Sequence, residues 1–165
     1  MANVTMKGNP MKTYGTLPAE GTTAPPFTLV KTDLTELSLS EFKGKKVVLN
    51  IFISLDTSTC ANSVRKFNEL ASGKVNTVVL AISKDLPFAA KRFCTTEGIQ
   101  NVITLSGFRD KDFGKAYGVE ITDSPYKGLY SRSIVVIDAG GKVVHCQQVQ
   151  ELSHEPDYTK ALAAL

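Results

Sequence analysis

Three cysteines carry the most evident chemistry of this chain, and Cys60 is the best placed of them. Residues 54–59 (SLDTST), directly before it, are rich in residues that begin helices. Val64, Phe67 and Leu70 follow at helical spacing, which places Cys60 in the first turn of a helix. Free backbone N–H groups and the helix dipole favour the thiolate there, and the thiolate is the nucleophilic form of cysteine. The same position also suits a small apolar core residue.

The other two cysteines give weaker signals. Cys94 lies 34 positions further on, beside Phe93 in a second predicted helix, and taken alone it is better explained by core packing than by reactivity. A disulfide between Cys60 and Cys94 would need Cα atoms about 4.4–6.8 Å apart, a distance that the sequence does not determine. Cys146 follows His145 in a predicted strand, where neighbouring side chains point to opposite faces, so these two cannot share a metal ion.

Several motifs of well-known chemistry do not occur in the sequence. The two histidines and three scattered cysteines do not have zinc-site spacing. There is no Cys-x-x-Cys pair of a dithiol oxidoreductase, no Gly-x-Ser-x-Gly of an α/β-hydrolase and no glycine-rich phosphate loop after a strand. We therefore expect neither a metal nor an organic cofactor.

Arg132 is the remaining residue of chemical interest. It begins a predicted strand and shares a face with the apolar Ile134 and Val136. An arginine directed toward a core needs an anionic partner. Two interpretations are open: a side chain that snorkels to solvent at the strand end, or a cation placed over a thiolate.

The elements that would position these residues alternate between strands and helices. Two apolar runs, residues 46–53 and 76–83, are typical of strands buried on both faces, and each precedes a helical pattern. Asp85 is the predicted cap of the second helix, which has Pro87 in its first turn and ends at Gly98. A strong hairpin signal, Ala139-Gly140-Gly141, joins two later strands. The other predicted elements are a hairpin turning at Asn9-Pro10, strands at 27–30 and 101–105, a helix at 111–117, an irregular segment at 119–130 and a final helix from 156.

This order predicts an α/β protein with a thioredoxin-like fold. Strand–helix–strand–helix, followed by an antiparallel hairpin and a closing helix, gives a central mixed sheet flanked by helices. The length of 165 residues, with 42% hydrophobic and 21% charged side chains, fits one globular domain over residues 1–165. The N-terminal β-hairpin is an extension of that domain.

Charge and hydropathy narrow the possible partners and location. A net charge of +3, not concentrated in any run, argues against nucleic acid. No stretch approaches the roughly 20 apolar residues of a membrane span, and residues 1–7 have no signal-peptide core. We therefore expect no membrane partner and a cytoplasmic location. Three cysteines are too few for a secreted disulfide framework, so a pair that oxidises is expected to be catalytic.

The sequence around Cys60 closely resembles that of the bacterial thiol peroxidases, which are atypical two-cysteine peroxiredoxins of the thioredoxin-like superfamily. The resemblance is carried by residues 50–60 (NIFISLDTSTC) and 63–68 (SVRKFN). It continues through 85–89 (DLPFA), 92–94 (RFC), 101–106 (NVITLS), 117–119 (YGV), 127–129 (KGL) and 135–138 (VVID). Such ordered agreement over nearly the whole chain is far more specific than any single motif.

The resemblance implies roles for four residues. Cys60 matches the peroxidatic cysteine, which attacks a hydroperoxide and becomes a sulfenic acid. Cys94 matches the resolving cysteine, which condenses with it to an intrachain disulfide that thioredoxin reduces. Thr57 and Arg132 match polar residues around the peroxide. Members of this family are usually homodimers and tend to prefer alkyl or lipid hydroperoxides.

The sequence departs from this family at one position. The family motif is Pro-x-x-x-Thr/Ser-x-x-Cys, and Ile53 occupies the proline position. Isoleucine can shield the thiolate, but it brings a backbone N–H and a looser turn. Three hypotheses are therefore considered: a peroxidase, a redox sensor or chaperone-like protein with weak turnover because of Ile53, and a structural domain with inert cysteines. Cys146 lies outside the two-cysteine scheme.

Overall fold

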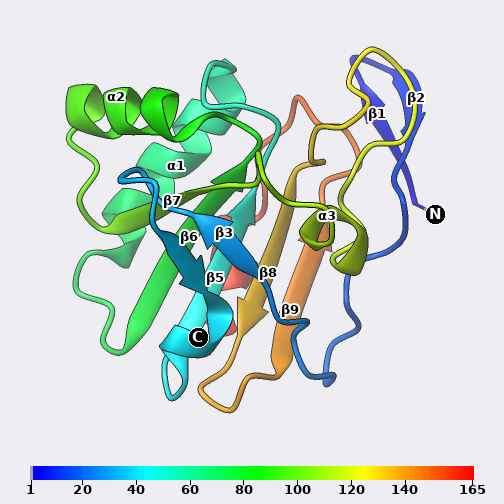
Figure 1. The fold of residues 1–165 in the computed structure, drawn as a ribbon. Coiled ribbons are helices and arrows are strands. Elements are labelled where there is room, and N and C mark those ends of the chain that lie inside the picture. The colour runs from blue at the N-terminus through cyan, green and yellow to red at the C-terminus, as the bar shows by residue number, and fades with distance from the viewer. Residues whose placement is uncertain (1) are drawn as a thin grey trace.

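A seven-stranded mixed sheet forms the centre of the protein (Figure 1), in a computed structural model that describes residues 2–165. The strand order is β4-β3-β7-β6-β5-β8-β9. The central strands β5, β6 and β7 are parallel, whereas β8 and β9 are antiparallel to their neighbours. The strands are β3 (Thr28–Val30), β4 (Glu36–Ser38), β5 (Lys46–Ile51), β6 (Thr77–Ser83), β7 (Val102–Ser106), β8 (Ser133–Ile137) and β9 (Val143–Gln148). The predicted thioredoxin-like arrangement is confirmed.

Helices cover both faces of this sheet. They are α1 (Ser58–Ala71), α2 (Pro87–Glu97), α3 (Phe113–Ala116) and α4 (Tyr158–Ala163), with a short 3-10 helix at Leu39–Phe42. None of the helices within residues 2–165 is both long enough and apolar enough to cross a membrane. A separate two-stranded sheet, β1 (Asn3–Met6) and β2 (Asn9–Lys12), is the predicted N-terminal hairpin.

Strand β5 is buried on both faces, as its continuous apolar sequence predicts. Val48 points to the core cluster that contains Cys60. Val47, Leu49 and Ile51 point to the second cluster on the opposite face. Because side chains alternate along a strand, a strand without polar alternation needs cover on both sides. The sheet therefore places the start of α1, which follows β5, directly over one of two cores.

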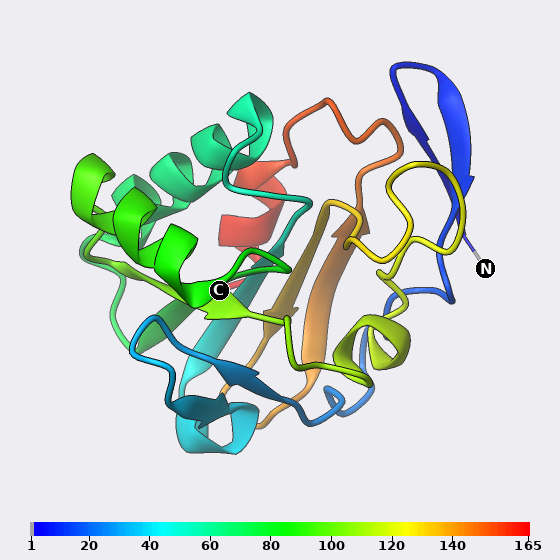
Figure 2. The same ribbon diagram turned by 45° about the horizontal axis from the view of Figure 1, so that its top comes forward.

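Helices α1 and α2 lie on the same face of the sheet. Right-handed crossovers that step across a sheet in one direction place their helices on one face. Strands β5, β6 and β7 step in one direction, and both helices contribute to a single core cluster through Val64, Phe67 and Ala90. Figures 1 and 2 show α1 and α2 side by side. Cys60 and Cys94 thus lie on the same side of the sheet, a point that the sequence left open.

Three local predictions need correction. The N-terminal hairpin turns at Lys7-Gly8, not at Asn9-Pro10, since both turn residues have positive φ (50° and 80°), as a two-residue hairpin turn requires. Pro10 is tolerated within β2 because β2 is an edge strand of the two-stranded sheet. The apolar run 46–53 predicted a strand that reaches Ile53, but β5 ends at Ile51. The Phe52 N–H still donates to the Ile82 carbonyl at 3.0 Å.

The third correction concerns the start of α2. The predicted cap, Asp85, does not cap this helix, whose N-cap is Leu86 with no side-chain hydrogen bond. Pro87 stands in the first turn and Gly98 ends the helix with φ of 66°, both as predicted. The carboxylate of Asp85 instead points back toward residues 54 and 55.

Candidate active site

Cys60 lies in the first turn of α1 and is completely buried. Thr57 is the N-cap, in an extended conformation (φ −98°, ψ 139°), and its carbonyl accepts the helix bond from Ala61 N at 3.0 Å. The Thr57 hydroxyl donates to the Ser54 carbonyl at 2.9 Å and makes no capping bond. The Thr57 side chain therefore braces the turn before the helix and leaves the first-turn N–H groups without a side-chain acceptor. No hydrogen bond joins it to Cys60 among the described residues.

Arg132 reaches Cys60 from the position directly before β8, so it does not begin the strand as predicted. Only 1% of its surface is exposed, and its Nη2 donates to Cys60 Sγ at 3.3 Å. Nε and Nη2 also donate to the Leu152 carbonyl, at 3.0 and 2.9 Å. Of the two interpretations of this arginine, snorkelling is wrong, because the guanidinium points inward. Within residues 2–165, Nη1 is buried without a hydrogen-bond partner.

No carboxylate within residues 2–165 forms an ion pair with Arg132. Every ion pair found within the described chain uses a different cation. A buried cation is costly unless an anion pairs with it. Cys60 Sγ lies beside this guanidinium, so Arg132 is placed to stabilise a negative charge that develops on the sulfur. Nη1 is a buried donor that none of the described residues uses.

Two buried polar side chains, Ser63 and Asn50, form a hydrogen-bonded chain to the first turn of α1. The Ser63 hydroxyl donates to the Cys60 carbonyl at 2.8 Å, and Asn50 Nδ2 donates to Ser63 Oγ at 3.2 Å. Asn50 and Ser63 are both fully buried. Sequence reasoning did not assign them a role, although a single asparagine inside the apolar run of β5 was a usable signal.

The Leu152 carbonyl that holds Arg132 is itself fixed by the N-terminal hairpin. Leu152 N donates to the Thr5 carbonyl at 2.8 Å. The neighbouring Glu151 carboxylate accepts hydrogen bonds from Gly8 N (3.0 Å), Lys7 N (2.9 Å) and the Thr5 hydroxyl (2.8 Å). The bond from Gly8 N, followed by one from the Ser153 hydroxyl at 2.7 Å and by that from Lys7 N, holds the pKa of Glu151 far below its ordinary value. Sequence reasoning missed this connection, because a backbone carbonyl acceptor leaves no signal in residue types.

Cys94 occupies a different environment from Cys60. It is half-buried near the end of α2, and its sulfur lies 3.8 Å from Thr104 Oγ1. Burial raises the pKa of the Cys94 thiol, so it is protonated at neutral pH. Cys94 lines a surface pocket of about 400 Å³ between α2, β7 and residues 31–33. All three cysteines are free, so the structure represents the reduced protein.

Cys146 lies apart from this site, on β9. Its backbone N–H donates to Glu20 Oε1 at 3.3 Å. Burial, followed by the nearby Glu20 charge, raises the pKa of the Cys146 thiol. Within residues 2–165, no group of three or more His, Cys, Asp or Glu side chains is arranged to hold a metal ion.

Ile53, the residue at the motif's proline position, packs in the same core cluster as Cys60 and is only 3% exposed. It follows the end of β5 and precedes the turn at Ser54. Among the described residues its backbone N–H donates to no hydrogen bond. Ile53 therefore adds apolar surface to the core that contains Cys60, but leaves the backbone at this point less constrained than a proline would.

Comparison with known proteins agrees with this geometry. The family model described as Redoxin matches residues 19–162. Proteins named thiol peroxidase from Corynebacterium glutamicum and Mycobacterium tuberculosis are each 53% identical over 165 residues, covering 100% of this chain and 99% of theirs. A solved structure of a peroxiredoxin-like protein from Aquifex aeolicus is similar with a TM-score of 0.92 at 38% identity, over 100% of this chain and 98% of that one. The fold is also shared with a thiol peroxidase from Chromobacterium violaceum, with a TM-score of 0.90 at 23% identity over 98% and 93%.

Proposed function

Because the chain belongs to the Redoxin family, as a thiol peroxidase of the peroxiredoxin type, we propose that it reduces hydrogen peroxide and organic hydroperoxides at Cys60. The observation that carries the proposal is the buried contact between Arg132 Nη2 and Cys60 Sγ at 3.3 Å. It supports a thiolate at Cys60 with a cation beside the position where the peroxide must react. Alkyl and lipid hydroperoxides are the proposed organic substrates, by resemblance to the family.

In the first step, the Cys60 thiolate attacks one oxygen of the hydroperoxide. The O–O bond breaks, the attacked oxygen stays on sulfur as a sulfenic acid, and the other oxygen leaves with a proton as water or an alcohol. Charge develops on the departing oxygen, and pre-positioned donors lower the energy of that transition state. The free Nη1 of Arg132 and the first-turn N–H groups of α1 are the proposed donors.

In the second step, Cys94 resolves the sulfenic acid. Its sulfur attacks Cys60 Sγ, an S–S bond forms, the S–O bond breaks, and the oxygen leaves as water with the thiol proton. The disulfide protects Cys60 from further oxidation, and thioredoxin reduces it for the next cycle. Because Cys60 is buried and Cys94 lies protonated beside Thr104, this step requires the turn before α1, or α2 itself, to move.

The proposal also covers the domain organisation, oligomeric state, cellular location and reductant of the protein. One domain over residues 1–165 is part of this proposal, and it is supported by two core clusters that pack on the same sheet. By resemblance to the family, we propose a homodimer that acts in the cytoplasm with thioredoxin as its reductant, without a metal or organic cofactor.

A second function, a peroxide sensor with weak turnover, is favoured by one observation. Ile53, in the same core cluster as Cys60, replaces the motif proline, which leaves the turn less constrained. A sensor would form the Cys60–Cys94 disulfide in proportion to peroxide but would cycle poorly with thioredoxin.

The test is peroxide-dependent NADPH consumption with thioredoxin and its reductase. We expect steady turnover for the native protein and for Cys146→Ser, no oxidation at the active site of Cys60→Ser, and a single turnover without thioredoxin recycling for Cys94→Ser. Peptide mapping after peroxide should find an intrachain Cys60–Cys94 link. A dominant Cys60–Cys146 or interchain link would contradict the resolving role of Cys94. Stoichiometric disulfide formation without turnover would favour the sensor.

A further inference from the structure

We propose that Asp85 is a positioning residue whose carboxylate holds the turn before Cys60 closed against the start of α2. In this role it sets the balance between the closed form, in which Cys60 meets peroxide, and an opened form, in which Cys94 reaches it. The inference rests on the proposed function, in which Cys60 and Cys94 act one after the other.

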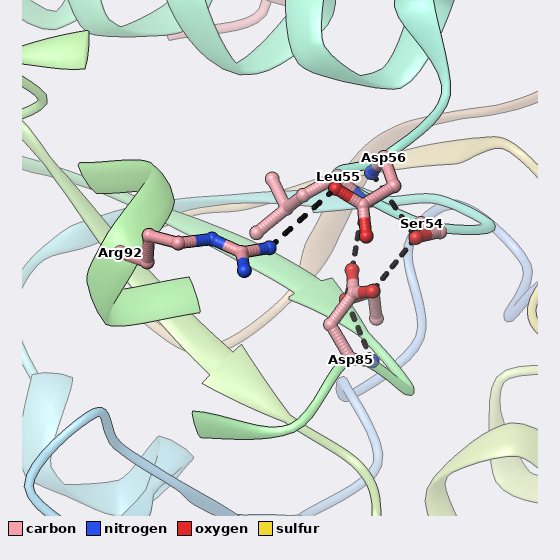
Figure 3. Close-up of polar contacts among 6 residues, drawn as sticks. Ser54, Leu55, Asp56, Asp85 and Arg92 are labelled. Carbon is pink, nitrogen blue, oxygen red and sulfur yellow. Dashed lines mark hydrogen bonds and ion pairs between the residues drawn. The ribbon is translucent and has the colours of Figure 1, made fainter. Parts of the chain in front are cut away.

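The contacts of Asp85 link two segments about 30 residues apart (Figure 3). Its Oδ1 accepts a hydrogen bond from the Ser54 hydroxyl at 2.7 Å. Its Oδ2 accepts from Leu55 N at 2.7 Å and from the Ser83 hydroxyl at 2.7 Å. Asp85 follows β6 and stands two residues before α2, the helix that carries Cys94. One carboxylate therefore ties the turn that leads to the peroxidatic cysteine to the base of the resolving helix.

Ser54, which donates to Asp85, also makes most of the hydrogen bonds within the turn. The Ser54 carbonyl accepts from both the backbone N–H and the hydroxyl of Thr57, at 3.1 and 2.9 Å. Its hydroxyl, besides donating to Asp85, accepts from Asp56 N at 3.1 Å. Thr57 is the N-cap of α1, so the position of Ser54 fixes where the helix begins and where Cys60 points.

Disulfide formation must disturb this arrangement. Cys60 is completely buried beside Arg132, whereas Cys94 lies next to Thr104, and neither sulfur has the other as a partner. If the turn leaves its place to expose Cys60, the bonds from Ser54 and Leu55 to Asp85 must break. A hydrogen bond to a charged acceptor is strong enough that its loss shifts an equilibrium by about tenfold or more. Asp85 thus stabilises the closed form specifically.

A neighbouring ion pair provides the matched control. Arg92 of α2 lies 3.9 Å from Asp56 of the same turn, with 72% and 77% of these side chains exposed. Figure 3 shows it beside the Asp85 contacts. Exposed pairs of this kind contribute little, because solvent screens them and both side chains lose freedom. Asp56→Asn therefore removes a carboxylate from the same turn without touching the proposed link.

The test measures the two chemical steps separately by stopped flow. In Asp85→Asn, the side chain loses its charge and keeps a single oxygen to accept from Ser54, Leu55 and Ser83, so the link is weakened. We expect Cys60–Cys94 disulfide formation to be about tenfold faster than in the native protein, while peroxide attack on Cys60 is no faster. The yield of sulfinic acid at high peroxide, read by intact mass, should fall, because the sulfenic acid is resolved sooner. Asp56→Asn should leave both rates within about twofold of the native values.

Unchanged or slower disulfide formation in folded Asp85→Asn would overturn the proposal, as would an equal acceleration in Asp56→Asn. If Asp85→Asn does not fold, Ser54→Ala decides, since it removes one of the three accepted bonds and should accelerate disulfide formation less, in the same direction. Absence of any Cys60–Cys94 disulfide in the native protein would instead reject the proposed function, so the two failures are distinguishable.

Discussion

Replacing Arg132 by methionine should slow the attack of Cys60 on peroxide by about 10- to 150-fold. Methionine keeps much of the side-chain length but removes the charge and the donor to Cys60 Sγ, at 3.3 Å. A hydrogen bond to a charged group contributes about 1.5–3 kcal/mol, and about 1.4 kcal/mol corresponds to a tenfold change in rate. With 1% of Arg132 exposed, solvent does not reduce this contribution. The substitution also leaves the Leu152 carbonyl without its donor, so we expect a loss of stability of about 1–3 kcal/mol.

The assay is stopped-flow oxidation of Cys60 by hydrogen peroxide, together with alkylation of Cys60 by iodoacetamide at neutral pH. Both should slow in Arg132→Met, because the variant lacks the cation and the hydrogen-bond donor that lie beside Cys60 Sγ. Arg132→Lys, which keeps the charge but has one donor group, should fall between the two proteins. Arg109→Met removes a half-exposed arginine that pairs with Glu36 at 3.7 Å and should change neither rate. Native rates in folded Arg132→Met, or an equal loss in Arg109→Met, would refute the reasoning.

Two further predictions concern Ile53 and Glu151. Ile53→Pro should speed peroxide attack by about tenfold or more and leave reduction by thioredoxin nearly unchanged. The proline fixes the turn and removes an N–H that makes no hydrogen bond within the described chain. Equal or slower oxidation of the folded variant would show that isoleucine at this position does not slow catalysis. The pKa of Glu151 is lowered from 4.5 on folding, so its contribution to stability is complete above that pH and is lost as the pH falls through the folded pKa. Urea unfolding should therefore show Glu151→Gln less stable than the native protein at neutral pH, with the difference shrinking in acid; a difference independent of pH would contradict this role.

The sequence alone determined the order of elements and the place of Cys60. Apolar runs at 46–53 and 76–83, helix-starting residues at 54–59 and the glycines at 140–141 are local patterns, and local patterns fix local structure. The first turn of α1 could therefore be predicted, and with it the position of Cys60 at the start of a helix. The identity of the family was also present in the sequence, because the resemblance covers nearly the whole chain.

The partners of the site were decided only by the tertiary structure. Arg132 lies 72 positions from Cys60, and its local pattern suited an exposed strand end equally well. Asp85 carries a typical helix-cap signal, yet its carboxylate bonds to Ser54 and Leu55, because the parallel order of β5 and β6 brings the ends of both strands to the same edge of the sheet. The Leu152 acceptor is a backbone carbonyl, which every residue type provides. A side chain's partner depends on which distant elements the packing places beside it, and hydrophobic periodicity specifies only the face that is buried.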